Sequence, residues 1–418
     1  PRTREGEKLP PGNAVGSSKS ELKAISHGGT EARRKKTVSS GILWLAAVLL
    51  MLLPATASAQ QPSHNLFIKA DGSLWGMGYN YAGQLGLDDL VDRNEGVQIV
   101  ESGVSAVSMG ESHTIFLKAD GSVWVMGGQP TNASQLGLGD NLQRRIPTQV
   151  LSSGAVFVAA GLGTSFFIKD DGSLWGMGQG QWLGLGDSAA RNEPTQIISS
   201  GVKSINTRDG SPNSLIVKED GSLWGISNTI PYEILSSGVA SAAVSTGHSL
   251  VVKTDGSLWV MGQNVSGQLG TGDTAQRNEL TEILSSGVSS VAAGAGHSLI
   301  LKTDGSLWVM GANSNGQLGV GDTSPLNIPT QIMPSGVQGI ASAMAHSMIL
   351  KTDGSLWGMG RNDRGQLGLG DTTQRTIPTQ IVASGVARLA EMVNIAPTDI
   401  NATATLTIAE NQPIGTVV

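Results

Sequence analysis

The chain has 418 residues and a formal net charge of −6, with 39% hydrophobic residues, 14% charged residues, 57 Gly and no Cys. This density of Gly without a three-residue period excludes collagen and indicates many turns between short elements. The absence of Cys excludes disulfides, Cys-ligated zinc and thiol nucleophiles.

Residues 1–59 carry the features of an export signal. A basic cluster at residues 33–36 precedes an apolar run at residues 41–53, and Ala57-Ser58-Ala59 provides a small-residue cleavage site. The apolar run is too short to cross roughly 30 Å of hydrocarbon. We therefore expect a polar leader plus signal peptide, a secreted or cell-surface location, and no membrane span after cleavage.

Removal of the leader makes the remaining chain more acidic. Nine of the 27 basic and four of the 33 acidic residues precede residue 60, which leaves 18 basic and 29 acidic side chains, a net charge of −11. An acidic chain without a basic run repels phosphate backbones, so we expect no nucleic-acid partner.

A repeat centred on Asp-Gly-Ser-Leu-Trp runs through residues 60–392. Its Trp residues are separated by 49, 51, 49, 35, 49 and 49 positions, which gives seven copies with one short interval. They are Trp75, Trp124, Trp175, Trp224, Trp259, Trp308 and Trp357.

Each copy contains the signals of four short strands. In the sixth copy, Asp304-Gly305 separates two apolar runs and predicts a hairpin with a type I′ turn, in which both central residues have positive φ. Residues 287–294 predict a strand of small residues upstream, residues 316–319 a Gly-rich loop, and Pro329 the start of the last strand. The sequence therefore predicts an all-β, seven-bladed β-propeller with four-stranded antiparallel blades over residues 60–392.

The two ends of the repeat region are complementary. The first copy starts at His64 without the small-residue strand of the other copies, whereas residues 385–390 supply such a strand after the last copy. We expect residues 385–390 to pair with residues 64–69, so that the N- and C-terminal segments share one blade and no open edge remains.

The repeated aromatic and imidazole side chains are interpreted as structural. Each repeated Trp is expected to fill the space between neighbouring blades, which is worth roughly 1.5–3 kcal/mol for a large apolar side chain. A His lies eleven residues before five of the Trp residues, at His64, His113, His248, His297 and His346, and Thr164 and Asn213 replace it in two copies.

The symmetry of a ring places these His residues one per blade. Zinc requires ligands that converge within about 2.1 Å of one point. We therefore expect each imidazole to make a hydrogen bond that stabilises a blade, and we expect neither a metal site nor another cofactor.

The pattern Gly-x-x-His-Ser-(apolar)-x-(apolar)-Lys-x-Asp-Gly-Ser-Leu-Trp-x-Met-Gly, followed by Asn-x-x-Gly-Gln-Leu-Gly-x-Gly-Asp, resembles the regulator of chromosome condensation repeat over residues 63–392. This resemblance implies a seven-bladed propeller but no single activity. Founding eukaryotic members of the family act as guanine-nucleotide exchange factors for a small nuclear GTPase. Secreted bacterial members resemble this chain best, and some of them bind and block enzymes through one propeller face.

Residues 393–418 resemble a linker and the truncated start of a cadherin-like domain from bacterial surface proteins. The similarity lies in residues 394–400 and 408–418. The resemblance implies that Glu410 corresponds to a calcium ligand of that family. Its acidic partners are missing from this chain, so we expect no formed calcium site.

We expect a partner to bind where the copies of the repeat differ from one another. The fourth copy lacks the Gly-Gln-Leu-Gly loop, which leaves a notch on one face of the ring. Trp, Tyr and Arg are enriched at binding hot spots, although drift in a degenerate repeat is the alternative interpretation of these positions. The candidate partner-binding residues are Trp182, Tyr232, Tyr79, Tyr81, Arg208, Arg361 and Arg364.

These observations favour a non-catalytic protein-recognition or adhesion module of an exported, cell-surface bacterial protein, a monomeric propeller within a larger chain. One alternative is a secreted inhibitor that binds a hydrolase through one face of the propeller. Another is a guanine-nucleotide exchange factor, by analogy with the family. No Ser/His/Asp or paired-carboxylate arrangement stands apart from the repeat, so we expect no enzymatic activity.

Overall fold

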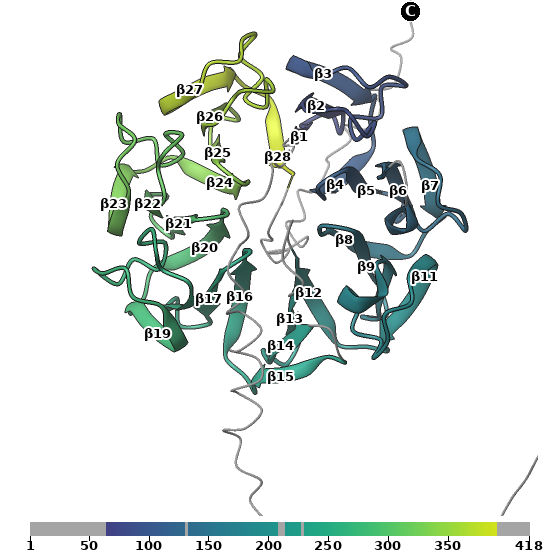
Figure 1. The fold of residues 1–418 in the computed structure, drawn as a ribbon, viewed down its shortest axis with the longest axis horizontal. Helices are drawn as coiled ribbons and strands as arrows, with labels where there is room; N and C mark the ends of the chain where they lie inside the picture. The colour runs from purple at the N-terminus through teal and green to yellow at the C-terminus, as the bar shows by residue number, and fades with distance from the viewer. Residues whose placement is uncertain (1–63, 130–132, 208–213, 227–229, 391–418) are drawn as a thin grey trace, which may run out of the picture. The chain divides into compact units, whose positions relative to one another are not determined.

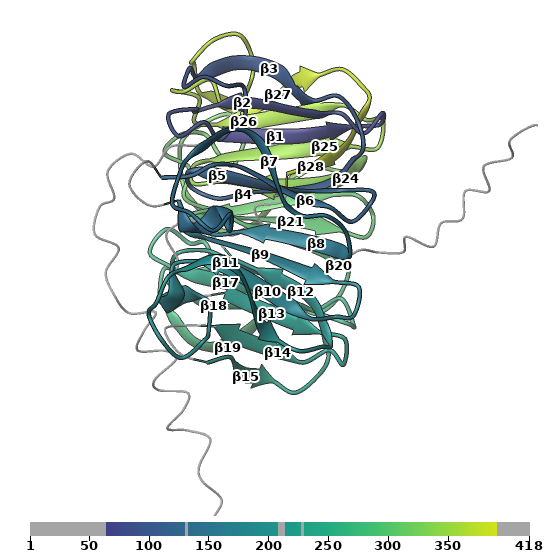
Figure 2. The same ribbon diagram turned by 90° about the vertical axis from the view of Figure 1, so that its right-hand side faces the viewer.

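The structure is a computed structural model that describes residues 64–129, 133–207, 214–226 and 230–390. These residues form seven four-stranded antiparallel sheets around a central axis (Figure 1). Seen from its side, the ring has strands that run from one face toward the other (Figure 2). The predicted seven-bladed propeller is therefore confirmed. The leader, Arg208, Asn213 and the cadherin-like segment lie outside the described residues.

The strands follow one order from the axis outward in every blade, and we number the blades from 1, which contains β1, to 7. The innermost strands of blades 1 to 7 are β28 (Val386–Leu389), β4 (Val104–Met109), β8 (Ala155–Ala160), β12 (Val202–Asn206), β16 (Val239–Val244), β20 (Val288–Ala293) and β24 (Val337–Ser342). The second strands are β1 (His64–Lys69), β5 (His113–Lys118), β9 (Thr164–Lys169), β13 (Ser214–Lys218), β17 (His248–Lys253), β21 (His297–Lys302) and β25 (His346–Lys351).

The outer half of each blade carries the repeated Trp and the edge of the ring. The third strands are β2 (Leu74–Gly78), β6 (Val123–Gly127), β10 (Leu174–Gly178), β14 (Leu223–Ile226), β18 (Leu258–Gly262), β22 (Leu307–Gly311) and β26 (Leu356–Gly360). The outermost strands are β3 (Arg93–Val100), β7 (Arg144–Leu151), β11 (Arg191–Ile198), β15 (Tyr232–Leu235), β19 (Arg277–Leu284), β23 (Leu326–Met333) and β27 (Arg375–Val382). Two short 3-10 helices, η1 (Ser134–Leu136) and η2 (Gly180–Trp182), precede β7 and β11.

The Asp-Gly pairs form the predicted hairpins but not the predicted turn type. In blade 6, Gly305 has a φ of 77°, whereas Asp304 does not take a positive φ. The Gly305 amide donates to Lys302 O at 3.0 Å, and the Lys302 amide donates to Ser306 O at 3.0 Å. The loop is thus the longer type that ends in a left-handed glycine. The Asp304 carboxylate accepts from the Ser306 amide at 2.8 Å within this loop.

The core lies between blades. One cluster combines Leu250 and Val260 of blade 5 with Val291 and Ile300 of blade 6, and Trp308 packs against it. Each of the seven repeated Trp residues packs in the same way against a cluster of buried side chains drawn from two neighbouring blades. Burial of these apolar surfaces holds neighbouring blades together.

The repeated Trp residues are half-buried rather than enclosed. The Trp308 indole N–H donates to Ser306 Oγ at 3.0 Å, and Lys302 Nζ lies 4.2 Å from the indole ring centroid. The same Trp–Ser hydrogen bond and the same Lys–Trp contact occur in all seven blades. The Asp-Gly-Ser-Leu-Trp motif therefore supplies the turn and the hydrogen bond that orients the indole, and the Lys two residues before the motif covers the ring.

The ring closes as the sequence predicts. Strand β28 pairs antiparallel with β1, with Phe67 opposite Leu389 and Ile68 opposite Arg388. The Ala390 amide donates to Leu66 O at 2.9 Å. Figure 1 shows the two ends of the repeat region, purple and yellow, in one blade. Within the described residues, no helix is long and apolar enough to cross a membrane.

Candidate functional site

The five repeated His residues form hydrogen bonds between blades. In each case Nε2 contacts a hydroxyl or amide oxygen of the next blade at 2.8–3.1 Å. The pairs are His64–Thr114, His113–Ser165, His248–Ser298, His297–Ser347 and His346–Asn65.

Burial favours the neutral form of two of these imidazoles, those of His64 and His113. It lowers the pKa of His64 from 6.5 to about 3, with neighbouring imidazoles adding to the effect, and it lowers the pKa of His113 to about 4. Within the parts of the chain that the structure describes, no three His, Cys, Asp or Glu side chains group together as metal ligands.

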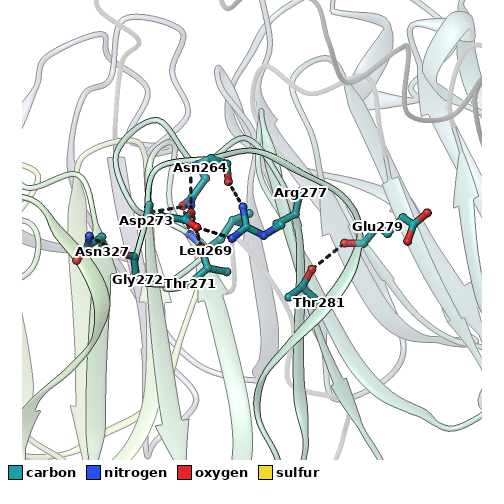
Figure 3. A network of polar contacts seen from close by, with 10 residues as sticks. Asn264, Leu269, Thr271, Gly272, Asp273, Arg277, Glu279, Thr281 and Asn327 are labelled. Carbon is teal, nitrogen blue, oxygen red and sulfur yellow. Dashed lines mark hydrogen bonds and ion pairs between the residues drawn. The ribbon is translucent and has the colours of Figure 1, made fainter.

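A loop between the third and outermost strands, which we call the covering loop, projects from each full-length blade. In blade 5, Asn264 organises it: Asn264 Oδ1 accepts from the Leu269 amide at 2.9 Å, and Asn264 Nδ2 donates to Asp273 O at 2.9 Å (Figure 3). Arg277 pairs with Asp273 at 2.7 Å and lowers the pKa of that carboxyl to about 2.

The covering loop of one blade binds the outermost strand of the next. The Gly272 amide donates to Asn327 O at 2.8 Å, and Asn327 Nδ2 donates back to Gly272 O at 3.0 Å (Figure 3). The Glu95–Leu369 bridge belongs to the corresponding contact between blades 7 and 1. The covering loops differ in sequence between the copies and contain the candidate residues Tyr79, Tyr81, Arg361 and Arg364.

Three of the candidate residues meet where blade 7 contacts blade 1. The Arg364 guanidinium lies 5.3 Å from the Tyr79 ring centroid, and Arg364 Nη1 lies 3.6 Å from Asp92 Oδ2. The Tyr79 and Tyr81 rings stack with centroids 6.2 Å apart. We call Tyr79, Tyr81, Asp92 and Arg364 the tyrosine–arginine cluster.

In the cluster, the Asp92 carboxylate is held by a hydrogen bond and the Tyr81 ring is exposed. Asp92 Oδ1 accepts from the Asn80 amide at 2.9 Å, which fixes the carboxylate beneath the guanidinium. Burial raises the pKa of Tyr79, whereas Tyr81 is 58% exposed. Glu111 of blade 2 acts on Tyr79 electrostatically, and burial raises its own pKa. The arrangement offers two aromatic rings with charges of both signs beside them.

The other candidates do not join this cluster. Arg361 donates to Asp363 Oδ1 at 2.7 Å within blade 7, and Trp182 is half-buried in η2 of blade 3. Arg208 lies outside the described residues. Tyr232 in β15 is half-buried, and burial raises its pKa.

Tyr232 fills space inside blade 4. A Cβ on Gly225 would meet the Tyr232 ring, whereas on the equivalent Gly358 it would meet Leu367 of the covering loop. The Tyr232 ring thus occupies the position of the leucine that blade 4 lacks, which is a structural role rather than the exposed one expected of a binding residue.

Sequence reasoning missed Asp92 and Glu111. A signal was present for Asp92, because the equivalent positions of the other copies hold Gln143, Ala190, Gln276, Pro325 and Gln374. Pairing Asp92 with Arg364 required the ring to bring blades 7 and 1 together.

A hollow of about 380 Å³ lies among the innermost strands of blades 1, 2 and 3. Val156, Phe157 and Leu389 supply its apolar lining, and Arg388 and Lys118 are its charged lining residues. Phe157 and Arg388 stand where the innermost strands of other blades carry small residues such as Ser290. Sequence reasoning did not single out this hollow.

The sequence matches a known repeat family in two regions of the ring. Residues 71–117, 255–301, 304–350 and 353–396 match the regulator of chromosome condensation (RCC1) repeat, and residues 288–317 match a second form of this repeat. No curated protein matches the chain significantly.

Solved structures share the fold. Prp20p from Saccharomyces cerevisiae, whose structure was described together with its binding properties to Gsp1p and histones, is 19% identical, with a TM-score of 0.65 over 78% of this chain and 86% of Prp20p. Human WBSCR16 is also 19% identical, with a TM-score of 0.65 over 79% of this chain and 99% of the human chain. At these identities the likeness concerns the fold alone.

Proposed function

We propose, from the premise that this chain is a seven-bladed propeller of the regulator of chromosome condensation repeat family, that it is a non-catalytic protein-recognition or adhesion module. We further propose that it is of the bacterial secreted type and belongs to an exported, cell-surface protein. The tyrosine–arginine cluster carries the proposal, because a propeller scaffold by itself fixes no activity.

The cluster has the composition and geometry of a binding hot spot. Tyr and Arg are enriched among residues that dominate binding energy. Stacking on Tyr79 and the contact of Arg364 with Asp92 restrict these side chains before a partner arrives, which reduces the entropy lost on binding. Tyr81 projects 58% of its surface to solvent and offers the ring that a partner would cover.

Sequence features support export and surface attachment. Residues 33–59 combine a basic cluster, an apolar run and a small-residue cleavage site. The resemblance of residues 393–418 to the start of a cadherin-like domain supports the proposal that the propeller is part of a larger surface protein. An exchange-factor role, by analogy with the binding of Prp20p to Gsp1p, would require that residues 1–59 do not direct export.

The test compares matched surface variants of the mature chain, residues 60–418. Tyr81→Ala removes the exposed ring of the cluster, and Val265→Ala removes the exposed side chain at the equivalent position of blade 5, where Val265 is 73% exposed. Each variant is used as bait for surface and secreted proteins of the source cells, with bound proteins identified by mass spectrometry.

We expect the wild-type chain and the Val265→Ala variant to bind a partner protein. The Tyr81→Ala and Arg364→Ala variants should not bind it. Retention by all variants would exclude the cluster as the binding site. If the retained partner is a hydrolase and the wild-type chain inhibits it, the inhibitor alternative replaces adhesion.

A further inference from the structure

The junction between blades 4 and 5 differs from the others in length. Trp224 and Trp259 are 35 positions apart instead of the usual 49, so blade 4 lacks most of a covering loop. Its outermost strand β15 has four residues, whereas the outermost strands of the other blades have eight. We call this the open junction.

At the other junctions, the covering loop seals an apolar residue of the next blade. The backbone at Gly270 lies so close to Met310 that a side chain there would collide with Met310 Sδ, and a Cβ would also lie 3.1 Å from Pro329. Glycines of the other loops cover the equivalent residues Met126, Met177, Ile226, Met359 and Met77. All six covered side chains are 0% exposed.

The equivalent methionine at the open junction is Met261, which is 8% exposed. Leu280 of β19 stands where Pro329 contacts the loop in blade 6, and it is only partly buried. Met261, which remains largely buried, and the partly buried Leu280 occupy the positions that the chain covers with its own loops at the other junctions.

The open junction also lacks, among the described residues, the hydrogen bonds that a covering loop makes at the other junctions. At five junctions, a loop amide donates to the backbone carbonyl of the second residue of the next outermost strand, at 2.7–2.9 Å. These acceptor residues are Arg145, Asn192, Asn327, Thr376 and Asn94. At the open junction the equivalent residue is Asn278.

Within the described residues, neither the carbonyl oxygen nor Nδ2 of Asn278 has a hydrogen-bond partner, while its Oδ1 accepts from Gln276 Nε2 at 2.9 Å. Asn278 is exposed, so water can satisfy both groups until a partner displaces it.

We propose that the open junction is a docking site for a glycine-containing loop of a partner protein. The partner loop places a glycine over Met261 and Leu280, as Gly270 lies over Met310 and Pro329. Its amide donates to the Asn278 carbonyl, and a loop carbonyl accepts from Asn278 Nδ2. Recognition then reuses the backbone contact that joins the other blades, as strand addition reuses the ladder of a sheet.

The acidic side chain beside the open junction indicates which charge a partner should carry. Glu279 is exposed beside Asn278, and its counterparts Glu193 and Glu95 lie next to the covering glycines Gly139 and Gly370. A partner loop flanked by Lys or Arg therefore fits best. A second copy of this chain fits less well, because its own covering loops are engaged in its own ring. The proposal does not rest on the tyrosine–arginine cluster.

The probe is a peptide with the sequence of residues 264–273, the loop that covers blade 6 in this chain. It is added to the mature chain labelled with ¹³C at the methionine methyl groups. We expect a saturable shift of the Met261 methyl resonance with no shift of Met310, which is already covered. A control peptide with Gly270→Val changes the left-handed glycine that lies over Met310, whose φ is 68°, and should leave Met261 unshifted.

A chain in which a covering loop is inserted into blade 4 tests the same surface, because the inserted loop is covalently attached and cannot dissociate. Residues 263–276 are inserted between Ile226 and Ile230 in place of residues 227–229, and a Gly/Ser insert of equal length serves as control. We expect the graft to slow peroxide oxidation of Met261 several-fold relative to the control insert, and to abolish the peptide-induced shift.

If the peptide causes no saturable Met261 shift, the proposal fails, even where the graft does not fold. A Met261 resonance that changes with protein concentration in the absence of peptide would show that a second copy occupies the junction, and would overturn the assignment to a partner loop.

Discussion

The junction between blades 7 and 1 and the junction between blades 4 and 5 are built from the same repeat and differ in what has been added or removed. At the first, the covering loop binds Asn94, β28 completes blade 1, and Arg364 reaches Asp92. At the second, the loop is missing and Tyr232 fills the gap that its leucine would occupy. The constant part of the repeat therefore packs each blade against the next. The covering loops determine which side chains of each junction are exposed to solvent.

The largest expected effect comes from breaking the junction between blades 7 and 1. A chain that ends at residue 384 loses β28, including buried Val386 and Leu389. At roughly 1.5–3 kcal/mol for each large apolar side chain, plus the lost strand hydrogen bonds, the free energy of unfolding should fall by about 5 kcal/mol or more.

The control for this truncation is a chain that ends at residue 392 and keeps β28. Urea unfolding followed by Trp fluorescence compares the two. Equal midpoints would mean that β28 does not close the ring.

Acid should next weaken the junctions that His64 and His113 bridge, between blades 1 and 2 and between blades 2 and 3. The folded-state pKa of His64 is about 3 and that of His113 about 4, both below the ordinary value of 6.5. Between pH 6.5 and 4 the unfolded chain therefore binds protons that the folded chain does not, so stability is complete above pH 6.5 and is lost as the pH falls. The loss should reach about 2 kcal/mol for each of these histidines at pH 5.

Urea unfolding between pH 7 and pH 5 measures this loss, and His113→Thr, which copies Thr164 of blade 3, should flatten the dependence. Blade 4 has Asn213 in place of the histidine, so hydrogen exchange at pH 5 should accelerate in blades 1 and 2 before blade 4. A pH-independent midpoint over this range would contradict the burial of neutral imidazoles.

At the open junction, Tyr232→Thr should cost about 3 kcal/mol, because it removes a large ring from a packed site and leaves a cavity. Thr is the residue at the equivalent position of blade 5, Thr281, so the backbone tolerates it. Tyr232→Phe keeps the ring and should be nearly neutral. Chemical denaturation distinguishes them, and equal losses for both variants would show that the hydroxyl rather than the ring matters.

The smallest effect on stability is expected for Arg364→Ala. The pair with Asp92 is half-exposed, with side-chain exposures of 47% and 33%, and such pairs contribute about 0–1 kcal/mol. Stability measured by urea unfolding should change little, while partner retention should be lost. A loss of stability as large as that of Tyr232→Thr would identify the cluster as a clamp between blades instead of a binding surface.

Repetition made the fold predictable. Six copies of Asp-Gly-Ser-Leu-Trp and one of Asp-Gly-Ser-Val-Trp predicted the number of blades. The missing first strand, together with residues 385–390, predicted the closure that β28 and β1 form. The turn type was not predicted, because the Asp304 carboxylate competes for backbone amides and leaves only Gly305 with positive φ.

The candidate site was predictable in composition and not in arrangement. Tyr79, Tyr81 and Arg364 were recognisable as unlike their counterparts, but Asp92 became their partner only when blades 7 and 1 met. Tyr232 was expected at a binding surface and instead fills the interior of blade 4, since an aromatic side chain serves either purpose and the neighbouring Gly225 decides which.

The sequence by itself determined the strands, the positions of the turns, the seven-fold repeat and the complementary ends, because hydrogen bonding and apolar alternation act over a few residues. Only the tertiary structure decided which side chains meet across a junction and which histidine bonds to which blade. It also decided that no covering loop among the described residues contacts Met261 and Asn278 as such loops contact their counterparts. Those contacts join residues that the chain separates by about fifty positions or by the whole ring, and closing the ring is what brings them within reach.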